Sequence, residues 1–478
     1  MRASRSAPRR GRDRGAPRAL DGRRNRWALG RMPGASFLPD DCRLSPQVRA
    51  LYLDRGGRDN PIAGARAGNG GNRRGTPRLA IPGARRVARR LARRLRLSDE
   101  RPLSRRRAVS RPAALAVKPV VVLDARITRR YSVGMRSYVR ELARRVPQAA
   151  PDLKIVVIAN TPLETEAELV RVGGANFGIT EEAVVPLTAR ALKASLMHHC
   201  SIYAPYEPGV PFLMTIHDLI HLEFPQQFKP TILAYYRLFT RRHVARAQRV
   251  VTDDEATVEA LERLLGAARA RVAVIPLAVD DAMLELADHP QPDEAERLRS
   301  LGIGDRPYLF YAGNHRAHKN LTTLFEAWRE LPCDLVITGS DDVPGGLGRY
   351  AHDGLRAIAA GEVDRALLAA IYRRAAVYVH PALAEGFGLP MVEAMAFGTP
   401  VVASARSIPE PLREAALAFP ALDAQALRRQ AERALNDDAL RSDLRTRGMA
   451  TARRLTWDRT AGATAALYRT VLEELSRR

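Results

Sequence analysis

The sequence predicts an α/β protein with two doubly wound, Rossmann-like parallel-sheet domains that face a cleft, preceded by a disordered arginine-rich leader. Short apolar, β-branched runs alternate with helical patterns from Lys118 onward. The alternation stops in a polar stretch, 286–306, and then restarts. The first 117 residues instead hold 31 arginines, no lysine and 8 acidic residues, and so carry +23 of the formal charge of +25.

The leader, 1–117, is expected to be disordered, because it is rich in Arg, Gly, Ala and Pro and poor in large apolar side chains. Within it, 84–97 places Val87, Leu91 and Leu95 four residues apart among arginines. That is the pattern of a basic amphipathic helix, which binds an anionic membrane or nucleic acid. An equal alternative is upstream sequence translated from a misplaced start, since Arg, Ala, Gly and Pro are encoded by GC-rich codons.

Strand-like runs define two domains after the leader. In the first, 118–285, they are "PVVVLDAR" (119–126), "KIVVIAN" (154–160), "PFLMTIHD" (211–218), "RVVTDD" (249–254) and "RVAVIP" (271–276). In the second, 307–455, they are "YLFYAG" (308–313), "CDLVITG" (333–339), "AVYVHP" (376–381) and "TPVVAS" (399–404). Residues 286–306 are expected to be the linker, and 456–478 a helix that packs back on the first domain.

The distribution of cysteines and apolar residues limits the class of protein. Cys42, Cys200 and Cys333 lie far apart without paired spacing, which argues against a disulfide framework or structural zinc and suits a reducing cytosol. No run reaches the ~18–20 apolar residues of a membrane helix, and the leader lacks the apolar core of a secretory signal peptide. We therefore expect a cytoplasmic protein, at most peripheral at the inner membrane surface, without a metal site.

The stretch "HPALAEGFGLPMVEAMAFGTPVVAS", 380–404, contains the strongest motif. It predicts a strand, a glycine-rich loop and then a helix with Pro390 as its first residue. The free N–H groups and positive dipole end of that helix would form a site for a diphosphate. Glu393, expected in the first turn, would accept from two adjacent hydroxyls. Taken singly, Glu385 is as well explained as a solvated loop charge and Glu393 as a helix-dipole partner, but their spacing around Gly-Phe-Gly favours a binding site.

This stretch resembles the donor-binding signature of the retaining glycosyltransferases of family 4, the glycosyl transferases group 1, which have the GT-B fold. Three further segments resemble the family in the expected order: "VLDARITRRYSVGMRSYVREL" (122–142), "FLMTIHDLIHLEFPQQF" (212–228) and "YLFYAGNHRAHKNLTTLFEAW" (308–328). The resemblance extends over nearly all of 118–478. It is specific for the family and unspecific for the sugar.

The resemblance implies a role for each motif residue. Glu393 would hold the ribose hydroxyls and Glu385 would lie beside the donor sugar. Lys319 would neutralise the leaving diphosphate, and His217 would reach the sugar or the acceptor, although a histidine bonded to backbone or to Asp218 is an equal alternative. The expected catalytic residues are Glu385, Lys319 and His217, and the expected donor-binding residues are Glu393, Gly386, Phe387, Gly388, Leu389, Gly313, Arg316 and Gly134.

One departure affects the phosphate contacts. Many relatives carry an arginine directly after the glycine that matches Gly313, where this chain has Asn314. We expect either Arg316 to substitute or Lys319 to act alone. A second departure places Asp254 where a serine is usual, which affects a helix cap.

The resemblance implies transfer of a sugar from a nucleotide-diphosphate sugar to a hydroxyl acceptor in polysaccharide or glycolipid biosynthesis, with no cofactor besides the donor. "YAGNHRAHKNL" is similar to mannosyl-type relatives, which favours GDP-mannose over a UDP-sugar; a lipid-linked saccharide is one candidate acceptor. Alternatives are a GT-B sugar-nucleotide epimerase or phosphorylase, or a basic nucleic-acid- or membrane-binding protein with a vestigial transferase body. The last rests on the leader alone, and nucleic acid is the less favoured partner.

Overall fold

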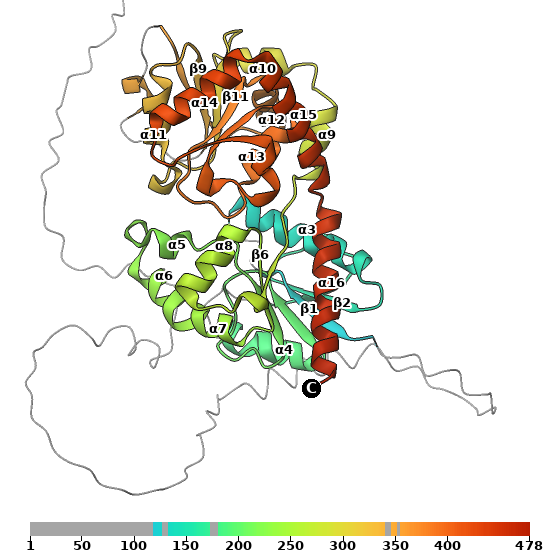
Figure 1. Ribbon diagram of the computed structural model, residues 1–478. Helices are drawn as coiled ribbons and strands as arrows, with labels where there is room; N and C mark the ends of the chain where they lie inside the picture. The colour runs from blue at the N-terminus through green and yellow to red at the C-terminus, as the bar shows by residue number, and fades with distance from the viewer. Residues whose placement is uncertain (1–117, 127–131, 173–179, 340–345, 351–353) are drawn as a thin grey trace, which may run out of the picture. The chain divides into compact units, whose positions relative to one another are not determined.

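Two parallel sheets organise the chain (Figure 1). The computed structural model describes residues 118–126, 132–172, 180–339, 346–350 and 354–478, all within one compact unit of the chain. For these residues the predicted two-sheet α/β fold is confirmed. The predicted leader, with its basic segment 84–97, lies outside them.

The first sheet has seven strands, and every neighbouring pair is parallel. In spatial order they are β3 (Glu168–Arg171), β2 (Lys154–Ala159), β1 (Val120–Asp124), β4 (Leu196–His199), β5 (Phe212–Thr215), β6 (Arg249–Thr252) and β7 (Val272–Val274). The chain builds outward from β1 to β3 and then returns to β4 on the other side. The order therefore reverses between β1 and β4.

The second sheet has six strands with the same doubly wound order. In spatial order they are β10 (Ala357–Gly361), β9 (Asp334–Thr338), β8 (Tyr308–Ala312), β11 (Val377–His380), β12 (Val401–Ser404) and β13 (Ala416–Phe419). The order reverses between β8 and β11, at the position where open α/β sheets bind ligands.

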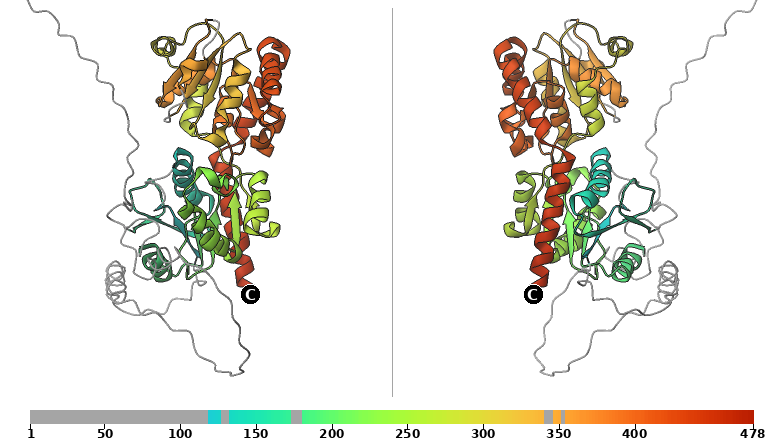
Figure 2. Two further views of the ribbon diagram at one scale, coloured as in Figure 1. Left: turned by 90° about the vertical axis from the view of Figure 1, so that its left-hand side faces the viewer. Right: turned by 90° about the vertical axis from the view of Figure 1, so that its right-hand side faces the viewer.

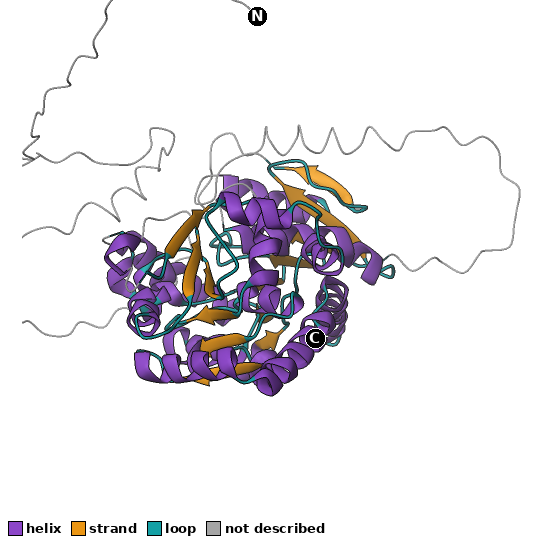
Figure 3. Ribbon diagram, turned by 90° about the horizontal axis from the view of Figure 1, so that it is seen from above, coloured by secondary structure: helices purple, strands orange, loops and turns teal. Residues whose placement is uncertain are grey.

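Helices lie on both sides of the strands, as parallel sheets require (Figure 3). With the first sheet they are α3 (Val133–Ala149), α4 (Val185–Ala191), α5 (Ile220–Glu223), α6 (Pro230–Tyr235), α7 (Arg241–Arg246) and α8 (Glu255–Ala260). The later helices are α9 (Asp281–Asp288), α10 (Glu294–Ser300), α11 (Leu321–Trp328), α12 (Arg365–Arg374), α13 (Leu389–Ala396), α14 (Ala424–Asn436), α15 (Asp438–Arg454) and α16 (Trp457–Ser476).

The segment expected to be a linker, 286–306, contains regular structure. Helix α9 extends into it as far as Asp288, and α10 occupies Glu294–Ser300. Arg373 of α12 donates to the backbone carbonyls of Leu286 and Ala287 and pairs with Glu294 at 3.2 Å. The polar composition therefore reflects short exposed helices that are fixed on α12, and not an irregular connector.

The C-terminal helix α16 lies against α3 of the first sheet (Figures 1 and 2). Its Arg469 pairs with Asp152 at 2.6 Å, and its Glu474 pairs with Arg249 of β6 at 2.5 Å. Its Tyr468 is completely buried. The twenty residues of α16 therefore complete the packing of the first sheet.

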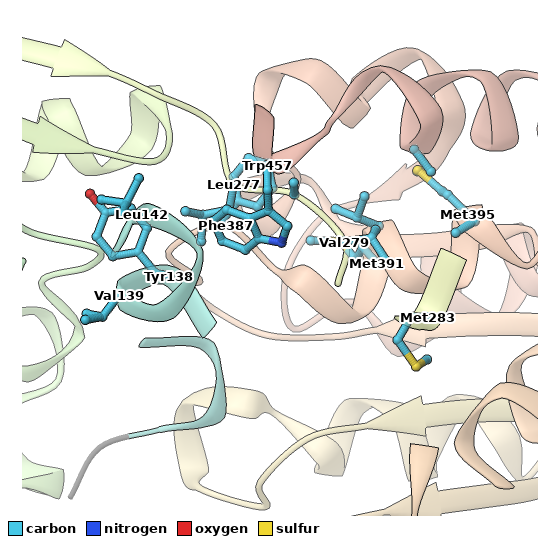
Figure 4. Packing of buried hydrophobic residues seen from close by; sticks show 14 of the residues in the cluster. Tyr138, Val139, Leu142, Leu277, Val279, Met283, Phe387, Met391, Met395 and Trp457 are labelled. Carbon is cyan, nitrogen blue, oxygen red and sulfur yellow. The ribbon is translucent and has the colours of Figure 1, made fainter. Parts of the chain in front are cut away.

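One apolar cluster connects α3, α13 and α16. The α3 side chains predicted to form its apolar face, Tyr138, Leu142 and Val146, are buried in it. Trp457, at the start of α16, lies beside Leu277 and Phe387 (Figure 4). This packing fixes the start of α16 next to the loop that follows β11.

None of the helices in the described part of the chain is both long and apolar enough to cross a membrane.

Candidate active site

The strand order brings the motif segments of the second sheet together. Gly313 directly follows β8, and the loop with Glu385 follows β11, which pairs with β8. Because carboxyl ends of adjacent parallel strands meet at one edge, residues 72 positions apart in the sequence become neighbours. Tyr378 of β11 donates a hydrogen bond to the carbonyl of Ala312 at 3.4 Å, which ties the two strand ends.

A cavity of about 690 Å³ lies at this edge and extends to the first sheet. Its size falls within the range of pockets that hold a small-molecule ligand. Of the predicted residues it is lined by Gly134, His217, Gly313, Glu385, Gly386, Phe387, Gly388, Leu389 and Glu393. Lys319 and Arg316 are not among its lining residues.

The helix start in the motif differs from the prediction by one residue. Gly388 has φ 72° and is the N-cap, so α13 begins at Leu389 and Pro390 is its second residue. A left-handed N-cap suits glycine, which has no Cβ to strain. Glu393 is consequently the fifth helical residue and lies beyond the first turn, where the prediction had placed it.

Two helix N-termini meet at the cavity. The first turn of α3 contributes Gly134, and the first turn of α13 contributes Leu389 and Pro390. A Cβ atom on Gly134 would lie 3.5 Å from Leu389 Cδ1, so the helix starts are in close proximity. Each helix carries a partial positive charge at this end, and together they favour an anion between them. Part of the first turns is already paired, since Met135 N–H donates to Ser132 Oγ and Met391 N–H donates to the Gly388 carbonyl.

Glu393 is partly buried at the wall of this cavity. Its Oε2 accepts a hydrogen bond from the Tyr372 hydroxyl at 2.9 Å. Burial raises the pKa of Glu393 to about 7, because the hydrogen bond from Tyr372 and the Arg365 charge only partly offset the loss of water. A carboxyl group whose pKa is near 7 can accept hydrogen bonds from the hydroxyl groups of a bound ligand.

Glu385 has the opposite electrostatic environment. Its Oε2 accepts from the Lys319 ammonium group in an ion pair and from His380 Nε2 at 3.1 Å. Burial would raise the pKa of Glu385, but the Lys319 charge and the His380 hydrogen bond hold it well below its usual range. Lys319 is therefore placed behind the cavity wall, in contact with a lining carboxylate.

His217 follows β5 and lies at the first-sheet side of the cavity. Its Nδ1 is 2.7 Å from Oδ2 of Asp253, which follows β6; the sequence had suggested Asp218 or backbone as partner. Burial lowers the pKa of His217, and the Asp253 carboxylate more than offsets that effect, so the pKa is raised. Its Nε2 has no hydrogen-bond partner within the described chain.

Two glycines allow close backbone contacts at the cavity. A Cβ atom on Gly386 would lie 2.6 Å from the carbonyl oxygen of His217, so the loop after β11 touches the chain after β5. A Cβ atom on Gly339, which follows β9 with φ 143°, would lie 2.1 Å from the carbonyl oxygen of Gly313. Larger residues at either position would separate these segments.

Arg316 is not brought to the other predicted residues. It is exposed, and its guanidinium group lies 5.9 Å from the ring centroid of Phe228, an aromatic residue of the first sheet's side. The expectation that Arg316 substitutes for a phosphate-binding arginine is therefore not supported by its position. Lys319, three residues later, instead contacts the cavity-lining Glu385.

Several lining or supporting residues were not predicted. They are Asp253, His380, Tyr372, Arg365, Asp280 and Gly339. Arg365, the first residue of α12, pairs with Asp280 at 2.9 Å. Asp253 and Gly339 directly follow strands and could have been proposed from that placement, whereas the contacts of Tyr372 and His380 depend on the fold. Among described residues, no three His, Cys, Asp or Glu side chains gather as metal ligands would.

Asp254 also has a role that its sequence position did not reveal. Its Oδ2 accepts from Ala256 N at 3.1 Å, which caps α8 as expected. Its Oδ1 accepts from the backbone N–H of Glu410, in the segment between β12 and β13, also at 3.1 Å. A serine could cap the helix, but a carboxylate has a second oxygen for the other contact.

Family models match both halves of the chain. Residues 133–282 match the model described as Glycosyltransferase Family 4, and residues 306–437 match the model described as Glycosyl transferases group 1. The two matches include every predicted site residue.

Relatives by sequence are glycosyltransferases. The chain is 27% identical over 298 residues to O-antigen chain mannosyltransferase B of Escherichia coli, covering 59% of this chain and 75% of that protein. It is 32% identical over 245 residues to D-inositol 3-phosphate glycosyltransferase of Xylanimonas cellulosilytica, covering 47% of this chain and 57% of that protein.

Solved structures share the fold. Sucrose-phosphate synthase from Thermosynechococcus elongatus aligns with a TM-score of 0.57 and 22% identity, covering 75% of this chain and 100% of that one. Anabaena Alr3699/HepE in complex with UDP and glucose aligns with a TM-score of 0.55 and 16% identity, with the same coverage. Motifs, fold and both family models agree, and the chain belongs to glycosyltransferase family 4, the glycosyl transferases group 1.

Proposed function

We propose that this glycosyltransferase is a retaining hexosyltransferase that moves a sugar from a nucleotide-diphosphate sugar to a hydroxyl acceptor. The observation that carries the proposal is the cavity in which the N-termini of α3 and α13 meet beside Glu393. Two helix ends suit a diphosphate, and a partly buried carboxyl group suits the two hydroxyls of a ribose.

The diphosphate would be stabilised as it leaves. When the bond between the sugar and the diphosphate breaks, negative charge grows on the phosphate oxygens between the helix N-termini. Lys319 supports this charge from behind Glu385, which lines the cavity, while Glu385 stays ionised beside the sugar. His217 faces the same cavity with its Nε2 unpaired among described residues, and this nitrogen would contact a sugar or acceptor hydroxyl.

We further propose GDP-mannose as the donor and a saccharide of polysaccharide or glycolipid biosynthesis, such as a lipid-linked saccharide, as the acceptor, with the reaction in the cytoplasm. The support is the resemblance of the segment 311–321 to mannosyl-type relatives, together with a relative whose name is O-antigen chain mannosyltransferase B. Peripheral contact with the membrane through the basic leader belongs to the same proposal.

The donor is tested by thermal unfolding of the full chain with GDP, UDP and their common sugar conjugates. A ligand that binds only the folded protein adds about 2.7 kcal/mol at a hundredfold excess over its dissociation constant. We expect a selective stabilisation by GDP and GDP-mannose that is lost in Glu393→Ala and kept in Glu414→Gln, at an exposed glutamate. Equal response to every nucleotide, or none, would contradict the donor assignment.

The retaining outcome needs its own measurement. A product formed from GDP-mannose and a mannoside acceptor should keep the anomeric configuration of the donor, which NMR of the new glycosidic linkage reports. Inversion would refute the retaining mechanism, and conversion of the donor without acceptor would point to an epimerase.

A further inference from the structure

Four completely buried side chains form a chain of hydrogen bonds through the first sheet. The Tyr468 hydroxyl on α16 is 2.7 Å from Nδ1 of His198, and Nε2 of His198 is 2.8 Å from Oγ1 of Thr215. Oγ1 of Thr215 is in turn 2.9 Å from the hydroxyl of Tyr138 on α3. All four residues are at most 1% exposed. This chain of hydrogen bonds thus joins α16, β4, β5 and α3.

The hydrogen bonds that link these four side chains are all donated in the same direction. Burial lowers the pKa of His198 to about 3, so the ring is neutral and has one N–H donor and one acceptor nitrogen. Whichever nitrogen carries the proton, His198 donates to one neighbour and accepts from the other. Each hydroxyl is thereby oriented by the next, and removing an end group affects the whole chain.

The chain ends on the ring of His217. The Tyr138 ring packs edge-on against the His217 ring, with centroids 4.7 Å apart and planes at 88°. Thr215, the last residue of β5, is two residues before His217, and both side chains face Tyr138, Thr215 at its hydroxyl and His217 at its ring. The His217 backbone carbonyl also accepts from Thr257 Oγ1 at 3.3 Å. The ring is therefore held between Asp253 on one nitrogen and Tyr138 on its edge.

We propose that Tyr138, Thr215, His198 and Tyr468 are positioning residues that hold the His217 ring against Asp253. Through them α16, which follows the second domain in the sequence, controls the catalytic competence of the first domain, which contains His217. The proposal rests on the proposed function in one respect, namely that His217 acts on the sugar or the acceptor.

The arrangement goes beyond ordinary core packing. Side chain–side chain bonds make up only about 10–15% of hydrogen bonds in proteins, and buried hydroxyls are usually satisfied by nearby backbone. Thr464, one turn before Tyr468 and completely buried, follows that usual pattern, since its hydroxyl donates to the Thr460 carbonyl of its own helix at 2.8 Å. Tyr468 instead reaches a histidine 270 residues earlier.

The direct test is the pKa of His217 in the full-length protein, read by NMR of imidazole-labelled histidine and assigned with His217→Gln. The groups that face His217 are Asp253, Asp218, Tyr138 and His198. In Tyr468→Phe we expect the His217 pKa to fall toward its ordinary value of about 6.5, because a looser ring loses part of its contact with Asp253. Tyr138→Phe, which keeps the packed ring and removes the other end of the chain, should act in the same direction.

Thr464→Val is the matched control, since it removes a buried hydroxyl from the same helix outside the chain. It should leave the His217 pKa unchanged. An unchanged pKa in both tyrosine variants would overturn the proposal, and so would an equal shift in Thr464→Val, which would indicate general loosening of α16. If Tyr468→Phe does not fold, Tyr138→Phe decides alone.

Transfer kinetics separate this proposal from the proposed function. In Tyr468→Phe we expect kcat to fall about threefold to tenfold with donor KM unchanged. The kcat of the double variant Tyr138→Phe/Tyr468→Phe should fall no further than that of the more severely affected single variant. If the two substitutions acted independently, their fold-changes would multiply. If the wild-type protein transfers no sugar, the proposed function is refuted. The His217 pKa measured by NMR still tests the positioning role of the hydrogen-bonded residues.

Discussion

In the loop after β11, Glu385 accepts from the cation of Lys319 and from His380; eight residues later, on α13, Glu393 accepts from the neutral hydroxyl of Tyr372. Burial acts on both carboxyl groups, yet the pKa of Glu385 is held well below its usual range and that of Glu393 is raised to about 7. The difference shows that one short motif can supply a permanent charge and a titratable group, according to the partners that the fold provides.

The two groups should give stability opposite pH dependences. A depressed carboxyl pKa contributes stability above its unfolded value, and this contribution is lost as the pH falls; that is the case for Glu385. A raised carboxyl pKa contributes stability at low pH that is lost as the pH rises from 4.5 to about 7; that is the case for Glu393. The predictions below test each side of this contrast.

Removing the cation should have the largest effect. Lys319→Met leaves the buried charge of Glu385 without its ion-pair partner, and the side chains are only 10% and 17% exposed. We expect a loss of about 3–5 kcal/mol in the free energy of unfolding by chemical denaturation at pH 7. Arg316→Met, at an exposed cation three residues away, should stay within about 0.5 kcal/mol. A loss in Lys319→Met no greater than in Arg316→Met would refute the contrast.

Removing the titration of Glu393 should come next. Ionisation of Glu393 between pH 4.5 and about 7 should lower the unfolding free energy of the wild-type protein by up to about 3 kcal/mol. Glu393→Gln should lack this component, whereas Glu414→Gln should keep it. Denaturation series at several pH values measure the difference. Parallel pH curves for wild type and Glu393→Gln would show that Glu393 titrates normally.

The junction between loop and helix should be more tolerant. Gly388→Ala places a Cβ atom at φ 72°, 2.2 Å from Met391 Cε, which can move aside. The remaining backbone strain should lower the unfolding free energy by about 1–2 kcal/mol. Gly462→Ala on α16 has open space and a helical backbone, and should instead gain about 0.5–1 kcal/mol. Thermal and chemical denaturation check both signs; a neutral Gly388→Ala would mean that the junction adapts.

The smallest effect concerns the neutral donor. Tyr372→Phe removes the hydrogen bond that lowers the pKa of Glu393. The midpoint of the Glu393 titration should rise above 7 by about half to one pH unit, as expected for a bond worth about 1 kcal/mol. Tyr308→Phe, whose hydroxyl donates to the Ile371 carbonyl at 2.7 Å, should leave this midpoint in place. A downward shift in Tyr372→Phe would reverse the assigned role of the hydroxyl.

The long apolar runs predicted the fold well, and the segments that were missed share a physical cause. The sequence showed no strand at β3, "ELVR", β4, "LMHH", β10, "AIAAG", or β13, "ALAF", because none of these segments is a β-branched run. All four become strands because parallel neighbours supply their hydrogen bonds. The helices within 286–306 were missed for the converse reason, since exposed helices are polar on most of their surface.

The site could be predicted as far as the motif places its residues next to strand ends. Glu385, Glu393 and His217 line one cavity because Glu385 and His217 follow strands at this edge and Glu393 lies on the helix that begins there. The contacts of Tyr372 with Glu393 and of His380 with Glu385 could not be predicted, because they depend on the fold, whereas Asp253 directly follows β6 and could have been proposed from that placement.

The position of α16 has a consequence for synthesis of the protein. Strands β1 to β7 leave the ribosome before Trp457 is made. The hydrogen bond of His198 with Tyr468 can form only after a further 270 residues have been synthesised. At about 5–20 residues per second this delay is on the order of ten to fifty seconds. During this time the nascent first domain exposes the surface that α16 will cover, including Nδ1 of His198. The first domain therefore cannot complete its packing until α16 has been synthesised.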